Sequence, residues 1–334
     1  MKSKLKLIVG GFMFVLAALT GISFYFVSMV RNYEPMTLSD IVDNDSLRPD
    51  YFIHGFEDPL EYGNAYDDVA FSSEGFNLFG WYIPAKDSSS TKTIMMIHGR
   101  GANRLRPLNR FQVLKDIGAD SSYNIFFPDL RNSGISDASK TDLGYNHATD
   151  IVNSMFFLNE TYGQDTFMIW GQSQGGMATA ISVNREDLVT RFDDAGFTLE
   201  RLILECPLST AEGSVMHDAT VKMGLPAFLV NMALWTWDTV HLDGYLSEMK
   251  MSKLIPGAKV PVLVIQGEVD YWTPTHLLQQ ELDPMPANAT LEMFKTGGHV
   301  RIYDQPENVE RYTRIVGEFL GFPVPAPTLA PTTE

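Results

Sequence analysis

The sequence predicts an α/β fold in which a mostly parallel, doubly wound β-sheet is covered by helices on both faces. Short apolar runs alternate with amphipathic segments along most of the 334 residues. These runs are unbroken rather than alternating with polar residues, which is typical of strands buried on both sides. One run leads directly into a serine flanked by glycines, at residues 171–175, followed by a small-residue segment.

Each element is expected where the hydrophobic pattern places it. The strands are expected at residues 68–71, 76–82, 93–97, 124–127, 167–170, 199–206, 260–266 and 290–294. The helices are expected at residues 107–117, 147–162, 174–183, 275–282 and 305–320. Apolar residues near a spacing of 3.6 support the helical segments, whereas short apolar runs bounded by turn residues support the strands. We therefore expect one large domain over residues 65–321.

One segment of this domain, residues 207–256, has no strand pattern. It is rich in methionine, tryptophan and other large apolar residues, including Trp235 and Trp237. We expect a helical cap insertion over the active site. Its apolar side chains either pack the cap onto the body or line a hydrophobic pocket, because methionine and tryptophan suit adaptable apolar surfaces.

The N-terminal residues 1–31 are expected to form one transmembrane helix that remains as a signal-anchor. Leu7 to Val30 contains no charged residue and is long enough, as a helix, to cross a hydrocarbon core of about 30 Å. Lysines precede this segment and acidic residues follow it, so the positive-inside rule predicts a cytoplasmic N-terminus and an extracytoplasmic catalytic domain. A cleaved signal peptide is the alternative, but its apolar region is usually shorter, about 7–15 residues.

Two further segments are predicted from composition. Residues 32–64 are polar and turn-rich and are expected to form a stalk between the membrane and the domain. Residues 322–334 are rich in proline and threonine and are expected to be a disordered tail.

Charge and cysteine content exclude some classes of function. The net charge of −16 makes nucleic acid an unlikely partner, because an acidic surface repels phosphate backbones. Cys206 is the only cysteine and lies in a predicted buried strand, so no intramolecular disulfide can form. No group of cysteine and histidine residues has metal-ligand spacing, and we expect neither a metal nor a cofactor.

The pattern Gly171-Gln172-Ser173-Gln174-Gly175 predicts a nucleophile elbow. A serine in such a sharp strand-to-helix turn has its hydroxyl exposed at the start of a helix. The positive end of the helix there favours developing negative charge. The flanking glycines are expected because the turn leaves no room for side chains beside the serine.

A serine nucleophile needs a base and an acid at the carboxyl ends of other strands. His299 follows the predicted strand 290–294 after two glycines and is the expected base. Asp270 follows strand 260–266 and is the expected acid, with Glu268 as the competing carboxylate. The chain order serine, aspartate, histidine differs from that of other serine-triad folds.

An oxyanion hole requires preorganised hydrogen-bond donors. We expect the backbone N–H of Gln174 to supply one, because it lies at the start of the helix after Ser173. The glycine-rich loop His98-Gly99-Arg100-Gly101 follows strand 93–97, and the backbone N–H of Arg100 is the expected second donor. His98 and Gly99 are expected to support this loop.

These motifs, together with Phe127-Pro128-Asp129-Leu130-Arg131-Asn132-Ser133-Gly134, resemble the α/β-hydrolase superfamily over residues 65–320. Within it the chain resembles the serine hydrolases of the BEM46-like and serine-aminopeptidase-like group. The resemblance implies an α/β-hydrolase fold and a serine mechanism. It also implies that Asp129 and Arg131 brace the oxyanion loop from behind.

The expected function is a membrane-anchored serine hydrolase that cleaves carboxylic esters or thioesters, with a carboxylesterase-like or lipase-like role. The expected partners are a small-molecule or lipid-like ester and the membrane. A serine peptidase or amidase is the alternative, since acidic residues of the cap could bind a substrate amine; these are Glu212, Asp218, Asp238, Asp243 and Glu248. A non-catalytic binding protein is the remote alternative. Epoxide hydrolases and dehalogenases are excluded because they need a carboxylate at the position of Ser173.

Overall fold

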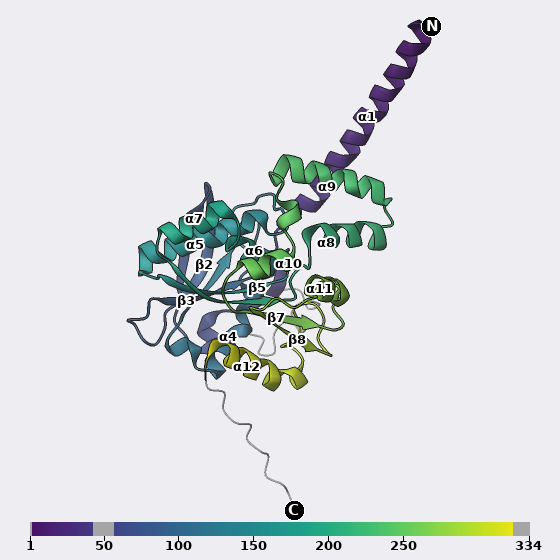
Figure 1. The fold of residues 1–334 in the computed structure, drawn as a ribbon. Coiled ribbons are helices and arrows are strands. Elements are labelled where there is room, and N and C mark those ends of the chain that lie inside the picture. Colours follow the sequence, from purple (N-terminus) through teal and green to yellow (C-terminus); the bar gives the residue numbers. More distant parts are fainter. Residues whose placement is uncertain (1, 43–56, 323–334) are drawn as a thin grey trace, which may run out of the picture.

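An eight-stranded β-sheet forms the centre of the molecule (Figure 1). The computed structural model describes residues 2–42 and 57–322. The strand order is β1-β2-β4-β3-β5-β6-β7-β8, in which β2 is antiparallel to both of its neighbours and all other pairs are parallel. The strands are β1 (Asp67–Ser73), β2 (Phe76–Ile83), β3 (Lys92–Ile97), β4 (Asn124–Asp129), β5 (Thr166–Gln172), β6 (Thr198–Glu205), β7 (Val262–Gly267) and β8 (Ala289–Phe294). The predicted mostly parallel sheet is confirmed.

Helices cover both faces of the sheet, as predicted (Figure 1). One face carries α5 (Tyr145–Tyr162), α6 (Gln174–Ser182), α7 (Glu186–Asp194), α10 (Met251–Gly257) and α11 (Thr275–Glu281). The other face carries α3 (Leu105–Leu108), α4 (Arg110–Asp116) and α12 (Pro306–Leu320). A short 3-10 turn, η2 (Ala119–Ser121), follows α4. Helix α7 is absent from the sequence-based prediction because it is strongly polar and buries only Leu188, which leaves little apolar pattern to detect.

The unbroken apolar strands supply two separate cores. Strand β3 shows this directly, because Met95 and Ile97 face the core beneath α5 and α6, whereas Ile94 and Met96 face the core beneath α4 and α12. Successive side chains of a strand point to opposite faces, so a strand buried on both sides must be apolar at every position. This is the physical reason for the unbroken pattern of the sequence.

Helix α1 (Lys2–Arg31) projects from the body and is long and apolar enough to cross a membrane (Figure 1). Most of its side chains are exposed in the structure, and only the C-terminal part packs against the body. There, Ser23 and Val27 are buried against the cap helix α9 (Ala227–His241). The hydroxyl of Ser23 donates to the carbonyl of Met232 (2.9 Å) and lies 2.6 Å from the hydroxyl of Thr236.

The insertion between β6 and β7 is helical. After α8 (Ala211–His217) the chain forms a π-helical turn, η3 (Asp218–Lys222), then α9, a 3-10 turn η4 (Tyr245–Glu248) and finally α10. An antiparallel bridge between Thr210 and Lys250 closes the base of the insertion. The expected cap is therefore a helical unit that lies beside α1 (Figure 1).

The described part of the predicted stalk packs on the body rather than standing free of it. Helix α2 (Leu38–Val42) and the 3-10 turn η1 (Pro59–Tyr62) bury Ile41 and Tyr62 in the core beneath α4. The carbonyl of Met36 accepts hydrogen bonds from the body, one from Asn103 Nδ2 and one from the Gly134 N–H. Scattered apolar residues in an otherwise polar segment account for this packing. Residues 43–56 of the stalk and 323–334 of the predicted tail lie outside the described residues.

Candidate active site

Ser173 occupies a strained turn between β5 and α6. Its φ of +55° lies in a region that non-glycine residues rarely adopt. A Cβ at Gly171 would lie 2.4 Å from Thr179 Oγ1, and a Cβ at Gly175 would lie 2.3 Å from the carbonyl of His98. Both glycines are therefore required by close packing, and the turn has the form expected of a nucleophile elbow.

The structure brings Ser173, His299 and Asp270 together in one hydrogen-bonded chain. Ser173 Oγ lies 2.8 Å from His299 Nε2, and His299 Nδ1 lies 2.8 Å from Asp270 Oδ2. A carboxylate can only accept, so Nδ1 carries the proton and Nε2 is free to accept the proton of the serine hydroxyl. The three residues come from the loops after β5, β8 and β7, at the carboxyl edge of the sheet.

The carboxylate of Asp270 is buried and fully hydrogen-bonded. Its Oδ1 accepts from the N–H groups of Trp272 and Thr273, both at 2.9 Å, and its Oδ2 also accepts from Thr273 Oγ1 at 2.7 Å. Burial acts to raise the pKa of Asp270, but the hydrogen bonds from His299 and Thr273 outweigh burial and lower that pKa. The competing carboxylate, Glu268, is exposed to solvent.

A buried ion pair lies beneath the loops that carry Ser173 and His299. Glu205, the last residue of β6, pairs with Arg110 of α4, and neither side chain has more than 1% exposure. Glu205 also accepts from Gln172 Nε2 (3.1 Å), the residue before the nucleophile. Arg110 donates to the carbonyl of Val300 (3.0 Å), the residue after His299. One ion pair thus holds the segments that carry the serine and the histidine.

The loop after β3 lies against the nucleophile. A Cβ at Gly99 would lie only 3.0 Å from Ser173 Cβ and 3.5 Å from its Oγ, so the backbone of Gly99 lies close against the serine. Arg100 is the next residue of this loop. Gln174 is the first residue of α6, and the first N–H groups of a helix have no intrahelical partner. The Arg100 guanidinium lies over the ring of Tyr33, 4.5 Å from its centroid.

His98 and Asp129 hold this loop in place. His98 Nε2 accepts from the Leu130 N–H (3.1 Å), so its Nδ1 carries the proton and donates to the Gly99 carbonyl (2.9 Å). Burial lowers the pKa of His98 to about 3, which keeps the ring neutral. Asp129 Oδ1 accepts from the Arg104 N–H (2.7 Å) at the end of the same loop.

The fold agrees with comparisons to known proteins. A family model described as the alpha/beta hydrolase fold matches residues 92–186, which run from β3 into α7. The chain has the α/β-hydrolase fold. No curated protein gives a significant match.

Solved structures with the same fold include both esterases and a peptidase. An esterase of Pyrococcus furiosus is 19% identical with a TM-score of 0.58, and the match covers 79% of this chain and 93% of the esterase. An esterase of Exiguobacterium antarcticum is 17% identical with a TM-score of 0.51, covering 76% and 100%. The acylaminoacyl peptidase of Pyrococcus horikoshii is 18% identical with a TM-score of 0.53, covering 77% of this chain and 41% of the peptidase. At these identities the likeness establishes the fold.

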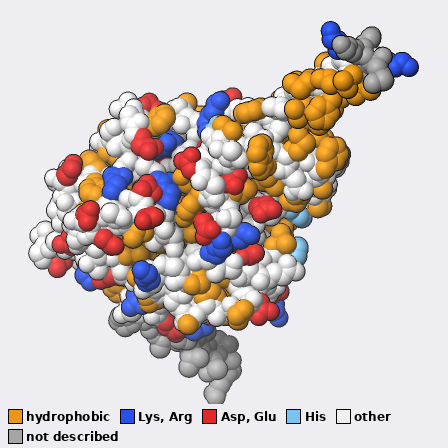
Figure 2. Space-filling view, turned by 45° about the horizontal axis from the view of Figure 1, so that its top comes forward, with side chains coloured by type: hydrophobic (Ala, Val, Ile, Leu, Met, Phe, Trp, Pro, Cys, Tyr) orange, Lys and Arg blue, Asp and Glu red, His pale blue; other side chains and the backbone are white. Residues whose placement is uncertain are grey.

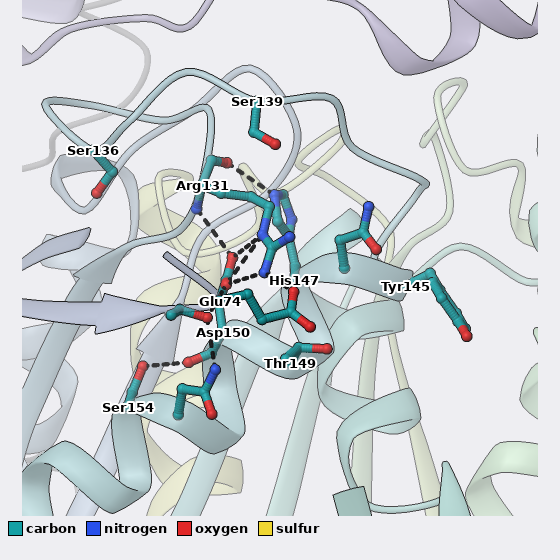
Figure 3. Close-up of polar contacts among 12 residues, drawn as sticks. Glu74, Arg131, Ser136, Ser139, Tyr145, His147, Thr149, Asp150 and Ser154 are labelled. Carbon is teal, nitrogen blue, oxygen red and sulfur yellow. Dashed lines mark hydrogen bonds and ion pairs between the residues drawn. The ribbon is translucent and has the colours of Figure 1, made fainter. Parts of the chain in front are cut away.

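The side chain of Arg131 pairs with two carboxylates outside the loop after β3. Its guanidinium forms a bidentate pair with Asp150 of α5 and a 2.7 Å ion pair with Glu74 (Figure 3). The closest N–O distance to Asp150 is 2.7 Å. Arg131 therefore fixes α5 against the loop after β4. The reason is that Asp150 offers a buried carboxylate with the planar geometry that a guanidinium matches.

His147 is a site residue that the sequence analysis did not identify. Its Nε2 donates to the Arg131 carbonyl (3.1 Å; Figure 3), and its Nδ1 accepts from the Gln174 side chain (3.0 Å). Burial lowers the pKa of His147 to about 3, so it remains neutral. His147 thus positions the residue that follows the nucleophile. Its place at the start of a helix rather than after a strand gave no sequence signal.

Cys206 lies close to Asp270 and His299. Its sulfur and the ligand atoms of Asp270 and His299 lie within 4.8 Å of one another. Burial raises the pKa of the Cys206 thiol, which disfavours the thiolate needed for nucleophilic attack or metal binding. Its sulfur accepts a hydrogen bond from the Val300 N–H (3.3 Å), and this contact helps to hold the histidine loop.

Proposed function

We propose that this protein is a membrane-anchored serine hydrolase that cleaves carboxylic esters or thioesters through an acyl-enzyme. The observation that carries the proposal is the hydrogen-bonded chain Ser173–His299–Asp270, with 2.8 Å at both links and the serine at a strained elbow. A buried acid, a histidine in a defined tautomer and an activated hydroxyl are the parts that nucleophilic acyl transfer needs.

The proposed reaction proceeds in two steps. His299 Nε2 takes the proton of Ser173 while the serine oxygen attacks the substrate carbonyl, and Asp270 stabilises the imidazolium that forms. The backbone N–H groups of Gln174 and Arg100 receive the negative charge of the tetrahedral intermediate. His299 then protonates the leaving alcohol or thiol, which leaves an acyl group on Ser173. A water molecule, deprotonated by His299, releases the acid and restores the serine.

Esters are favoured over amides by the character of the cap. Three of its five acidic side chains already have partners: Asp218 pairs with Lys222, Asp238 accepts from the Leu246 N–H, and Glu248 pairs with Lys253. These groups are less available to bind a substrate amine, while the rest of the cap is rich in apolar side chains. A peptidase of the serine-aminopeptidase-like group is the second candidate, because peptidases share the fold. An aminoacyl-p-nitroanilide panel beside p-nitrophenyl esters separates the two.

The nucleophile is tested with full-length protein in detergent. Ser173→Ala is expected to abolish p-nitrophenyl ester turnover and labelling by a fluorophosphonate probe. Ser247→Ala, an exposed serine of the cap, serves as the matched control and should retain both. Labelling that persists in Ser173→Ala would show that another residue is the nucleophile.

We also propose that α1 is retained as an anchor, with its N-terminus in the cytoplasm and the catalytic domain on the other side. Support comes from the length and apolar character of α1 and from the burial of Ser23 and Val27 against α9. Removing the helix would expose this face of the cap. N-terminal sequencing of the mature protein tests retention, since a start near residue 24 would identify a cleaved signal. Protease protection in sealed vesicles tests the orientation.

A further inference from the structure

An apolar pocket lies between the membrane helix and the cap. Its walls are formed by the C-terminal part of α1, by the segment from α8 to residue 225, and by α9. Every lining side chain is apolar, among them Val27, Ala219, Ala233 and Trp237, and the pocket is partly open to solvent. Cavities lined in this way do not hold water well and bind apolar ligands.

One end of the pocket, at the C-terminal part of α1, lies near the loop after β3. Trp237 lines the pocket and donates its indole N–H to Asp142 (2.6 Å). Tyr33, three residues after the pocket residue Val30, has its ring centroid 4.5 Å from the Arg100 guanidinium. Arg100 in turn follows the glycine that contacts Ser173. This end of the pocket is therefore linked to Ser173 through Tyr33, Arg100 and Gly99.

The outer end of the pocket adjoins the surface that α1 would bring to the bilayer. Met29 of α1 and Met223 line the pocket and are 42% and 54% exposed. Beside them, α9 exposes Phe228 (61%) and Trp235 (71%), although a helix of a soluble domain normally turns polar residues outward. Figure 2 shows hydrophobic side chains continuing from the projecting helix onto the adjoining body. Aromatic side chains of this kind favour the membrane–water boundary.

We propose that this pocket binds the long acyl chain of an ester dissolved in the bilayer, which enters along α1 with its carbonyl directed to Ser173. The proposal rests on the proposed function and makes it specific: the substrate is a membrane-resident acyl ester, and the anchor forms one wall of its binding site. No charged side chain lines the pocket, so an aliphatic chain is the ligand whose chemistry matches it.

Blocking the pocket tests acyl-chain binding. Ala219→Phe adds an aromatic ring at one wall of the pocket. Ala233→Phe adds a ring at the wall formed by α9. Ala227→Phe makes the same change at an exposed position of α9 and is the matched control. In nanodisc-reconstituted full-length protein, the two pocket variants should lower kcat/KM for p-nitrophenyl palmitate at least tenfold. Turnover of p-nitrophenyl acetate should stay within twofold, which also shows that the variants are folded.

Two results would overturn acyl-chain binding. If both pocket variants leave palmitate turnover unchanged, the chain binds elsewhere. If both lower acetate and palmitate turnover equally while fluorophosphonate labelling persists, the pocket shapes the site without holding the chain. The control variant should match the wild type with both esters.

The direction of entry is tested by how the substrate is presented. A long-chain ester placed in the same nanodisc as the enzyme should be hydrolysed at least tenfold faster than the same amount supplied in separate vesicles. Equal rates would show that the chain enters from water.

A binding measurement separates failure of the pocket from failure of the proposed function. In Ser173→Ala protein, 12-bromododecanoic acid should quench tryptophan fluorescence, because Trp237 lines the pocket. Ala219→Phe in the same background should reduce this quenching, whereas Ala227→Phe should not. Quenching with this pattern in a protein that hydrolyses no ester would refute the proposed function and retain the pocket. Equal quenching in all variants would refute the pocket.

Discussion

Arg31, the last residue of helix α1, forms an ion pair with Asp142, with 2.6 Å between Arg31 Nε and Asp142 Oδ1. The Asp142 carboxylate is almost fully buried and also accepts from Trp237 of the cap and Asn146 of α5. One carboxylate thus joins helix α1, the helical insertion and the body of the domain. The position of the helical insertion on the body therefore depends partly on a contact with α1.

Replacing Asp142 with alanine is expected to destabilise the protein by about 3 kcal/mol, because Arg31 and Trp237 lose a buried partner. Thermal unfolding of the full chain in detergent should show a Tm lowered by roughly 5–10 °C. Asp194→Ala, at an exposed position of α7, is the control and should leave the Tm nearly unchanged. Equal Tm values for the two variants would contradict the role of Asp142.

Asp270→Asn should lower kcat by about 10³–10⁴-fold, because the amide no longer fixes the histidine tautomer. Glu268→Gln should stay within twofold of wild type, since Glu268 is exposed and Asp270 occupies the position beside His299. Steady-state kinetics with a p-nitrophenyl ester measure both. A large loss in Glu268→Gln with a small one in Asp270→Asn would reverse the assignment of the acid.

Gly99→Ala should lower kcat by about tenfold or more, because the new Cβ lies 3.0 Å from Ser173 Cβ and displaces either the serine or the oxyanion loop. Gly298→Ala is the matched control: it precedes the catalytic histidine, but its Cβ would have no heavy atom within 4 Å. Fluorophosphonate labelling rates should follow the same order. If the Gly99→Ala protein is as active as the Gly298→Ala control, the loop that contains Gly99 does not form the oxyanion hole.

Ionisation of Asp304 should lower the free energy of unfolding of the protein as the pH rises. Burial raises the pKa of Asp304 to about 7, although the nearby Arg110 opposes this. The unfolded chain releases the proton near pH 4, whereas the folded chain retains it to about pH 7. The contribution of Asp304 to the free energy of unfolding is therefore fully present below pH 4 and is lost as the pH rises to 7.

Asp304→Asn removes this titration and keeps an oxygen for the 2.8 Å hydrogen bond from Asn109. The free energy of unfolding of the variant, relative to that of the wild type, should therefore increase between pH 4 and pH 7. Each pKa unit is worth about 1.4 kcal/mol, so the gain is on the order of a few kcal/mol. Unfolding measured at pH 4, 5.5 and 7 checks this, and a constant difference would show that Asp304 ionises normally.

The sequence predicted most of the fold because the relevant signals are local. Each strand buried on both faces is an unbroken apolar run, and Gly171 and Gly175 mark the elbow within five residues. Histidine and acid candidates could be chosen because parallel strands bring their carboxyl ends to one edge. Helix α7 and the packing of the segment around Ile41 were not predicted, since neither has a strong hydrophobic pattern.

The sequence by itself determined the elbow, the order of Ser173, Asp270 and His299, and the apolar character of α1. Each of these features depends on residues that lie close together in the chain. Tertiary structure alone decided how Glu205 meets Arg110, how His147 meets Gln174 and how α1 comes to form a pocket with the cap. Those partners are separated by tens to hundreds of residues. Whether a buried charge or an apolar face finds its complement depends on the packing of the whole chain.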